Sequence, residues 1–87
     1  MKVSGKQVAS ARELIGITQG ELAQAAGVGH ATVMRFETGQ MEPLQANLDK
    51  ILAALQERGI EFTNGDGIGV RLSFSKAAAY SAKHKEP

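Results

Sequence analysis

The sequence predicts a compact, mainly α-helical domain of four or five helices, followed by a short C-terminal β-hairpin. Up to Gly59, apolar residues recur at the three- and four-residue intervals of helices that bury one face. Beyond Gly59, apolar and polar residues alternate on both sides of the glycine-rich turn NGDGIG, which is the pattern of a hairpin. A chain of 87 residues provides one domain with a modest core.

The first two helices begin at capping-box patterns. Ser4 is followed three residues later by Gln7, and Thr18 is followed in the same way by Glu21. A third helix is expected to close at a glycine, and a fourth to begin at Pro43, because proline suits the first position of a helix. The four expected helices cover about residues 4–15, 18–26, 30–38 and 43–58.

The C-terminal third is expected to differ from the helical part. In the hairpin, one apolar face is expected to contain Ile60, Phe62, Val70, Leu72 and Phe74. The alanine-containing end has no matching apolar pattern and is expected to be a flexible tail, with at most a transient helix. The predicted organisation is therefore a helical domain over 1–59, a hairpin over 60–75 and a tail over 76–87.

Composition narrows the classes of function. The chain has no cysteine, so it forms no disulfide and no cysteine-ligated metal site, and neither a metal nor another cofactor is expected. It shows no secretory signal and no apolar run of membrane-spanning length, which indicates a cytoplasmic protein without membrane contact. The net charge is only +1, which argues against a large basic surface for nucleic acid.

The segment TQGELAQAAGVGHATVMRFETG, residues 18–39, has the side-chain sizes that two closely crossing helices need. Ala23 leaves room for a second helix, and Gly27 suits a turn with a positive φ angle. Val33 and Phe36 can anchor the second helix in the core. These sizes predict a helix-turn-helix, although any corner between two helices could use the same pattern.

The wider stretch ITQGELAQAAGVGHATVMRFETGQMEP, preceded by ARELIG and followed by NLDKILAAL, resembles the phage repressor and Cro-type (XRE-like) helix-turn-helix regulators. The resemblance covers about residues 8–57. The positions that match the family pattern are Ile17, Thr18, Gln19, Leu22, Ala23, Gly27, Val28, Thr32, Arg35, Glu37, Gly39 and Pro43. It implies a repressor-like DNA-binding domain and a sequence-specific regulator of transcription whose partner is double-stranded DNA.

The resemblance also implies a role for individual positions. The helix of about 30–38 would lie in the major groove, with base contacts from His30, Ala31, Thr32 and Arg35. Phosphate contacts would come from Gln19, Thr38 and Gln40. Arg12 and Glu37 would form a structural ion pair rather than touch DNA. Gly29 departs from the pattern, since the family often has Ser or Thr there to cap the helix.

A homodimer is expected, because one short helix contacts too few base pairs to define a site. The apolar face of the hairpin, with Ile60, Phe62, Val70, Leu72 and Phe74, is the expected interface, alone or with the fourth helix. Packing of this face within one chain remains the alternative.

The glycines of NGDGIG precede no phosphate-binding helix, and no catalytic set is present, so an enzyme is not expected. A protein-binding module with the same fold, such as an antiactivator or antitoxin-like protein, remains the alternative because the helical part is electrically neutral.

Overall fold

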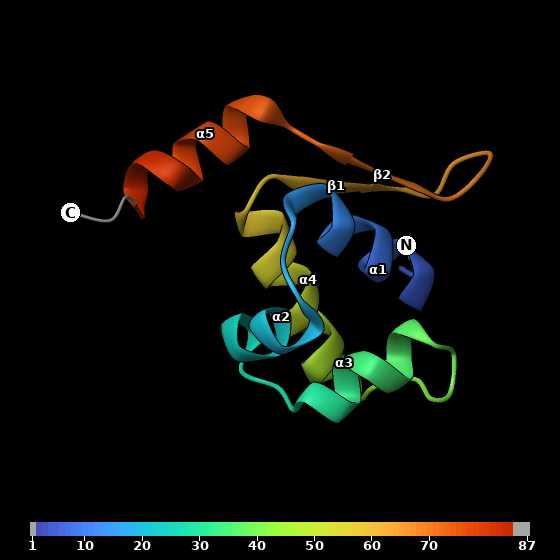
Figure 1. Ribbon diagram of the computed structural model, residues 1–87. Helices are drawn as coiled ribbons and strands as arrows, with labels where there is room; N and C mark the ends of the chain where they lie inside the picture. Colours follow the sequence, from blue (N-terminus) through green and yellow to red (C-terminus); the bar gives the residue numbers. More distant parts are fainter. Residues whose placement is uncertain (1, 85–87) are drawn as a thin grey trace.

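The computed structural model describes residues 2–84, which form five helices and a two-stranded antiparallel sheet (Figure 1). In chain order the elements are α1 (Gly5–Ile15), α2 (Gln19–Ala26), α3 (His30–Glu37), α4 (Gln45–Glu57), β1 (Ile60–Thr63), β2 (Gly69–Leu72) and α5 (Phe74–Lys83). The predicted fold class is confirmed.

The two predicted capping boxes are present. The Ser4 hydroxyl accepts from the Gln7 amide at 3.2 Å, and the Gln7 side chain accepts from the Ser4 amide at 2.9 Å. Thr18 and Glu21 form the same reciprocal pair at the start of α2. Helix starts are therefore well predicted where side chains nearby in sequence satisfy the free backbone amides.

The start of α4 differs from the prediction by two residues. Leu44, rather than Pro43, precedes a helix that begins at Gln45. The extended backbone of Leu44 places its carbonyl oxygen 2.9 Å from the Leu48 amide, which completes the first turn. A proline two positions before the helix is compatible with this geometry, because it needs no amide hydrogen there.

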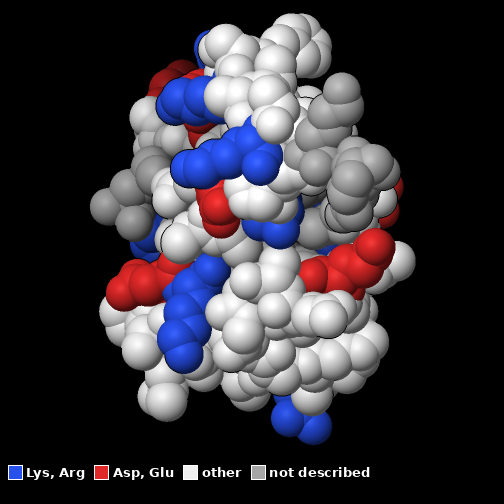
Figure 2. Space-filling view, turned by 90° about the vertical axis from the view of Figure 1, so that its left-hand side faces the viewer, with Lys and Arg blue, Asp and Glu red and all other residues white. Residues whose placement is uncertain are grey.

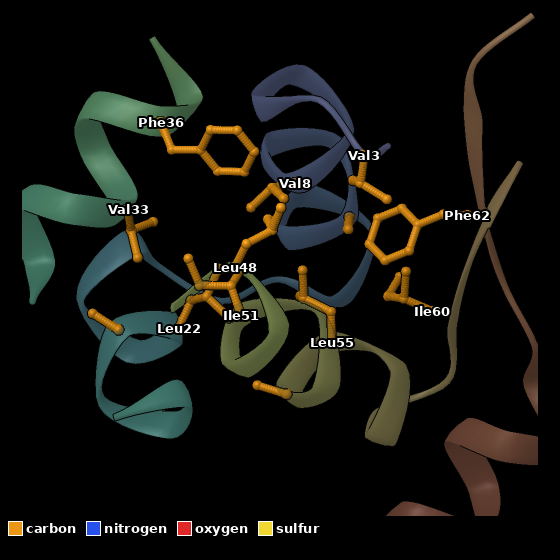
Figure 3. Packing of buried hydrophobic residues seen from close by; sticks show 13 residues of the cluster. Val3, Val8, Leu22, Val33, Phe36, Leu48, Ile51, Leu55, Ile60 and Phe62 are labelled. Atoms are coloured by element: carbon orange, nitrogen blue, oxygen red, sulfur yellow. The ribbon is translucent and has the colours of Figure 1, made fainter. Parts of the chain in front are cut away.

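The core lies between the first four helices and β1. In Figure 3, Phe36 of α3 points toward Val8 of α1, while Ile60 and Phe62 of β1 lie on the other side of the cluster. The buried apolar residues are Val3, Val8, Ala11, Leu22, Ala23, Val33, Phe36, Leu48, Ile51, Ala54, Leu55, Ile60 and Phe62. The hairpin is thus part of the same core as the helices.

This packing corrects the expected role of the hairpin's apolar face. Ile60 is 1% exposed and Phe62 is 9% exposed within a single chain, so neither is available to a second subunit. Val70 and Leu72 are partly buried against the same core. Phe74 is not in a strand; it begins α5 and is 83% exposed. The hairpin faces inward because α1 and α4 present the apolar surface that it covers.

A buried glutamine attaches the hairpin to α1. The Gln7 Nε2 group donates to the carbonyl oxygens of Thr63 and Gly69, at 3.2 and 3.1 Å, and to Asn64 Oδ1 at 2.9 Å. Asn64 in turn donates to the Lys2 carbonyl oxygen at 2.7 Å. Gln7 therefore caps α1 through its Oε1 atom and holds both strands through its Nε2 group.

The predicted flexible tail is corrected over residues 76–83, which belong to helix α5, while residues 85–87 lie outside the described range. Ser73 caps the helix by accepting from the Lys76 amide at 3.3 Å. No residue of α5 is buried, so the helix adds no side chain to the core. Polar contacts hold it instead: Lys76 bonds Glu61 at 2.8 Å, and the Arg58 guanidinium lies over the Tyr80 ring.

Candidate nucleic-acid interface

Helices α2 and α3 cross as the sequence predicts for a helix-turn-helix. Gly27 has a φ of 73°, and its amide donates to the Ala23 carbonyl oxygen at 2.9 Å, which ends α2. Ala23 is buried, and its small side chain lets α3 approach. Val33 and Phe36 point into the core and fix the rotation of α3 about its axis (Figure 3).

The opposite side of α3 is exposed. An α-helix turns by about 100° per residue, so the side opposite Val33 and Phe36 carries Ala31, Met34, Arg35 and Thr38. All four are exposed, including Met34 at 39%. This outward face is free to enter the major groove of B-DNA, which admits one α-helix.

The four residues predicted to contact bases do not all lie on the same face of α3. Ala31 and Arg35 lie on the outward face, and His30 is exposed at the first turn of α3, next to Gly20 of α2. Thr32 is half-buried at the side of the helix. Met34, an exposed apolar residue of the outward face, is not among the predicted contacts.

Arg12 and Glu37 form a bidentate ion pair that joins α1 to α3. Arg12 Nε and Nη2 each lie 2.8 Å from a Glu37 carboxylate oxygen, and Arg12 Nη1 donates to the Ile17 carbonyl oxygen at 3.0 Å. Only 4% of the Glu37 side chain and 15% of the Arg12 side chain are exposed. The hydrogen bond and charge of Glu37 raise the pKa of Arg12 above its ordinary value.

The ion pair extends to Gln19, the first residue of α2. Gln19 Nε2 donates to Glu37 Oε1 at 3.1 Å, so the side chain is oriented in the free protein. The amide retains a second hydrogen, and the free backbone amides of the α2 N-terminus lie beside it. This corner can therefore donate hydrogen bonds to an anion such as a phosphate.

Thr38 and Gln40 lie at the other end of α3. The Thr38 hydroxyl donates to the Met34 carbonyl oxygen at 2.9 Å and accepts from Gln40 Nε2 at 3.0 Å. The hydroxyl hydrogen of Thr38 is therefore already used, whereas Gln40 keeps one amide hydrogen free to donate. Of the two, Gln40 is the better placed donor.

Lysine and arginine are sparse around α2 and α3. Arg35 is the one residue of either kind between Thr18 and Gly39. Figure 2 faces the left-hand side of Figure 1, and at the level of α2 it shows a surface that is mostly uncharged, with acidic and basic side chains intermingled above it. Lys6, which is not among the predicted contacts, lines a shallow hollow together with Thr38 and Gly39. It adds one cation beside the end of α3.

Two further observations concern residues 2–84. None of their helices has the length and apolar character needed to cross a membrane. Within the same range, no three histidine, aspartate or glutamate side chains come together as a metal-binding group.

Comparison with known proteins identifies a helix-turn-helix in the same region. A family model described as helix-turn-helix matches residues 8–62, which is more than half of the chain and covers α2, α3 and α4 completely. No curated protein matches the sequence.

Proposed function

Because the chain belongs to the XRE-type helix-turn-helix family, a family of DNA-binding regulators, we propose that it binds a specific operator by placing α3 in the major groove. The observation that carries the proposal is the outward face of α3, where Arg35 is exposed between two donor groups. Gln19 lies at one end of this surface and Gln40 at the other.

Each group has a distinct task in this proposal. The Arg35 guanidinium donates to guanine O6 and N7 together, which is the commonest specific contact in the major groove. His30 and Ala31 add contacts at the start of α3, and Thr32 contacts the edge of the groove. Gln19 and Gln40 bind phosphates on the two sides and set the register of the helix, and Thr38 orients Gln40.

The test is binding of the full chain to duplexes selected from a random library, measured by fluorescence anisotropy with scrambled duplex as competitor. Arg35→Ala is expected to weaken binding to the selected duplex by about 1–3 kcal/mol. Arg71→Ala, which removes an arginine of the hairpin, is the matched control and is expected to leave affinity unchanged. Equal, weak binding of all three proteins to every duplex would contradict the proposal.

We further propose that the protein binds as a homodimer on a two-fold site and represses by occluding a promoter. Its interface would be α5 with the adjoining groove rather than the whole hairpin face. Phe74 projects from α5, and a hollow of about 370 Å³ lies between α1, β2 and α5. Its apolar lining is Leu14, Ile15, Ile17, Leu72, Ala77 and Tyr80. Exposed apolar groups of this size, on a domain with a small core, favour a second copy as the cover.

The protein-binding module is kept as the second candidate because Arg35 is the one lysine or arginine in the segment of α2 and α3, residues 18–39. A module that acts as an antiactivator or an antitoxin by binding another protein has no need of sequence-dependent affinity for DNA. The anisotropy assay separates the two candidates, since this alternative predicts no duplex that survives competition.

A further inference from the structure

The outward face of α3 carries an apolar strip formed by Ala31 and Met34. The proposed function gives a contact to Ala31 but none to Met34. Ala31 and Met34 are three residues apart, so their side chains are neighbours on the helix surface. Both are exposed, although Met34 is a large apolar residue. The core beneath α3 is filled by Val33 and Phe36, and Met34 is not part of it.

The apolar strip lies between a charged side chain, Arg35, and a hydroxyl side chain, Thr38. Arg35 follows Met34 directly and shares its exposed side, and Thr38 lies one turn beyond Met34. The Thr38 hydroxyl donates its hydrogen to the Met34 carbonyl oxygen. The centre of the outward face therefore has no hydrogen-bond donor of its own. The neighbouring strong donor is the Arg35 guanidinium.

In the major groove, the 5-methyl group of thymine is the apolar group that the four ordinary bases present. On the basis of the function proposed above, we propose that Met34, with Ala31, reads a thymine methyl next to the guanine that Arg35 contacts. Met34 thereby determines specificity rather than affinity for DNA in general. Its unbranched, polarisable thioether can adapt to the methyl group without a fixed rotamer.

The adjacency follows from the helix. Met34 and Arg35 are consecutive and diverge by about 100°, so their side chains reach base pairs that are neighbours or nearly so. The proposal therefore predicts a half-site with thymine and guanine close together, on the same or opposite strands. A cytosine at the thymine position would present an amino donor to the apolar strip and leave that donor without a partner.

The test replaces single thymines by deoxyuridine in the operator selected with the full chain. This change removes one methyl group and leaves the base pairing intact. We expect one position in each half-site where the replacement weakens wild-type binding by about three- to five-fold, the effect of one apolar carbon leaving contact. In Met34→Ala this penalty is expected to disappear.

Met41→Ala is the matched control, since Met41 is also 39% exposed but lies in the loop after α3. It should retain the full deoxyuridine penalty. A penalty that is absent from the wild type, or unchanged in Met34→Ala, would overturn this inference and leave sequence-specific binding standing. Failure to select any duplex would instead overturn the proposed function, so the two failures are distinguishable.

Discussion

Glu37 shows how one side chain can serve both the fold and the interface. It neutralises Arg12, joins α1 to α3 and holds Gln19 at the start of α2. The carboxylate is almost fully buried, so its charge must be matched within the protein. The same contacts that stabilise the domain also set the position of a proposed phosphate donor.

Replacing Glu37 by Gln should therefore destabilise the protein, because the Arg12 charge loses its partner in a largely buried site. The expected loss in the free energy of unfolding is about 3 kcal/mol. Urea unfolding followed by circular dichroism measures it. Glu42→Gln is the control, since Glu42 pairs with Lys2 on an exposed surface and should cost under about 1 kcal/mol. Equal losses in the two variants would argue against the structural role of the buried pair.

Gly5 provides a second test at the scale of a single residue. A β-carbon at this position would overlap the Phe36 carbonyl oxygen, because α1 begins directly against the end of α3. Gly5→Ala is expected to lower the free energy of unfolding by about 1–3 kcal/mol through overpacking. Gly65→Ala, in the open hairpin turn, has free space and should change stability little. Thermal unfolding of both variants provides the measurement, and a stable Gly5→Ala would contradict the close approach.

Among the elements, α5 is held by polar contacts rather than by burial. The Lys76 ammonium group bonds Glu61 at 2.8 Å, and Arg71 bonds the other Glu61 oxygen at 2.7 Å. The hydrogen bond from Lys76, followed by the charges of Arg71 and Lys76, lowers the pKa of Glu61. A carboxylate with a lowered pKa in the folded state stabilises the fold at neutral pH.

This contribution should be complete above the ordinary pKa of glutamate, about 4.3, and lost as the pH falls through the lower pKa of the folded state. NMR titration of the Glu61 carboxyl carbon should show the lowered midpoint. Lys76→Ala should move that midpoint upward, whereas Lys83→Ala, at the far end of α5, should not. A midpoint unaffected by Lys76→Ala would show that this contact does not hold α5 on β1.

For the molecule as a whole, the scarcity of cations near α3 predicts a weak dependence of DNA affinity on salt. Arg35 is directed at a base in the proposed mode, and Lys6 is the additional cation beside α3. With one or two phosphates neutralised, the logarithm of affinity should fall with the logarithm of salt concentration with a slope of about 1–2 per subunit. Anisotropy titrations at several salt concentrations give the slope. A slope of about five or more per subunit would contradict this prediction and reveal a larger basic surface in contact with DNA.

The proposed dimer also makes a prediction for the whole molecule. Phe74→Glu would place a charge in the proposed interface and should shift the protein toward monomer in sedimentation analysis. Ile68→Glu is the control, because Ile68 is another exposed apolar residue, at 61%, on the hairpin loop. Loss of the dimer in both variants, or in neither, would contradict an interface centred on α5.

The sequence by itself determined the first helices, and the side of α3 that faces outward, because the signals for these features are local. Capping boxes at Ser4 and Thr18 and the glycine after α2 involve residues a few positions apart, so they specify the same local structure in any context. The spacing of Ala23, Val33 and Phe36 likewise predicted which side of α3 is buried. Arg35 could be selected for the outward side from the same spacing.

Only the tertiary structure decided where the apolar face of the hairpin packs. Alternation showed that Ile60 and Phe62 share one side of a strand, but both the protomer's own helices and a second chain could cover that side. Gln7 and Gly5 acquired their roles from segments at least 30 residues away. The physical reason is common to these cases: burial and close contact depend on which distant surfaces meet, and local spacing does not contain that information.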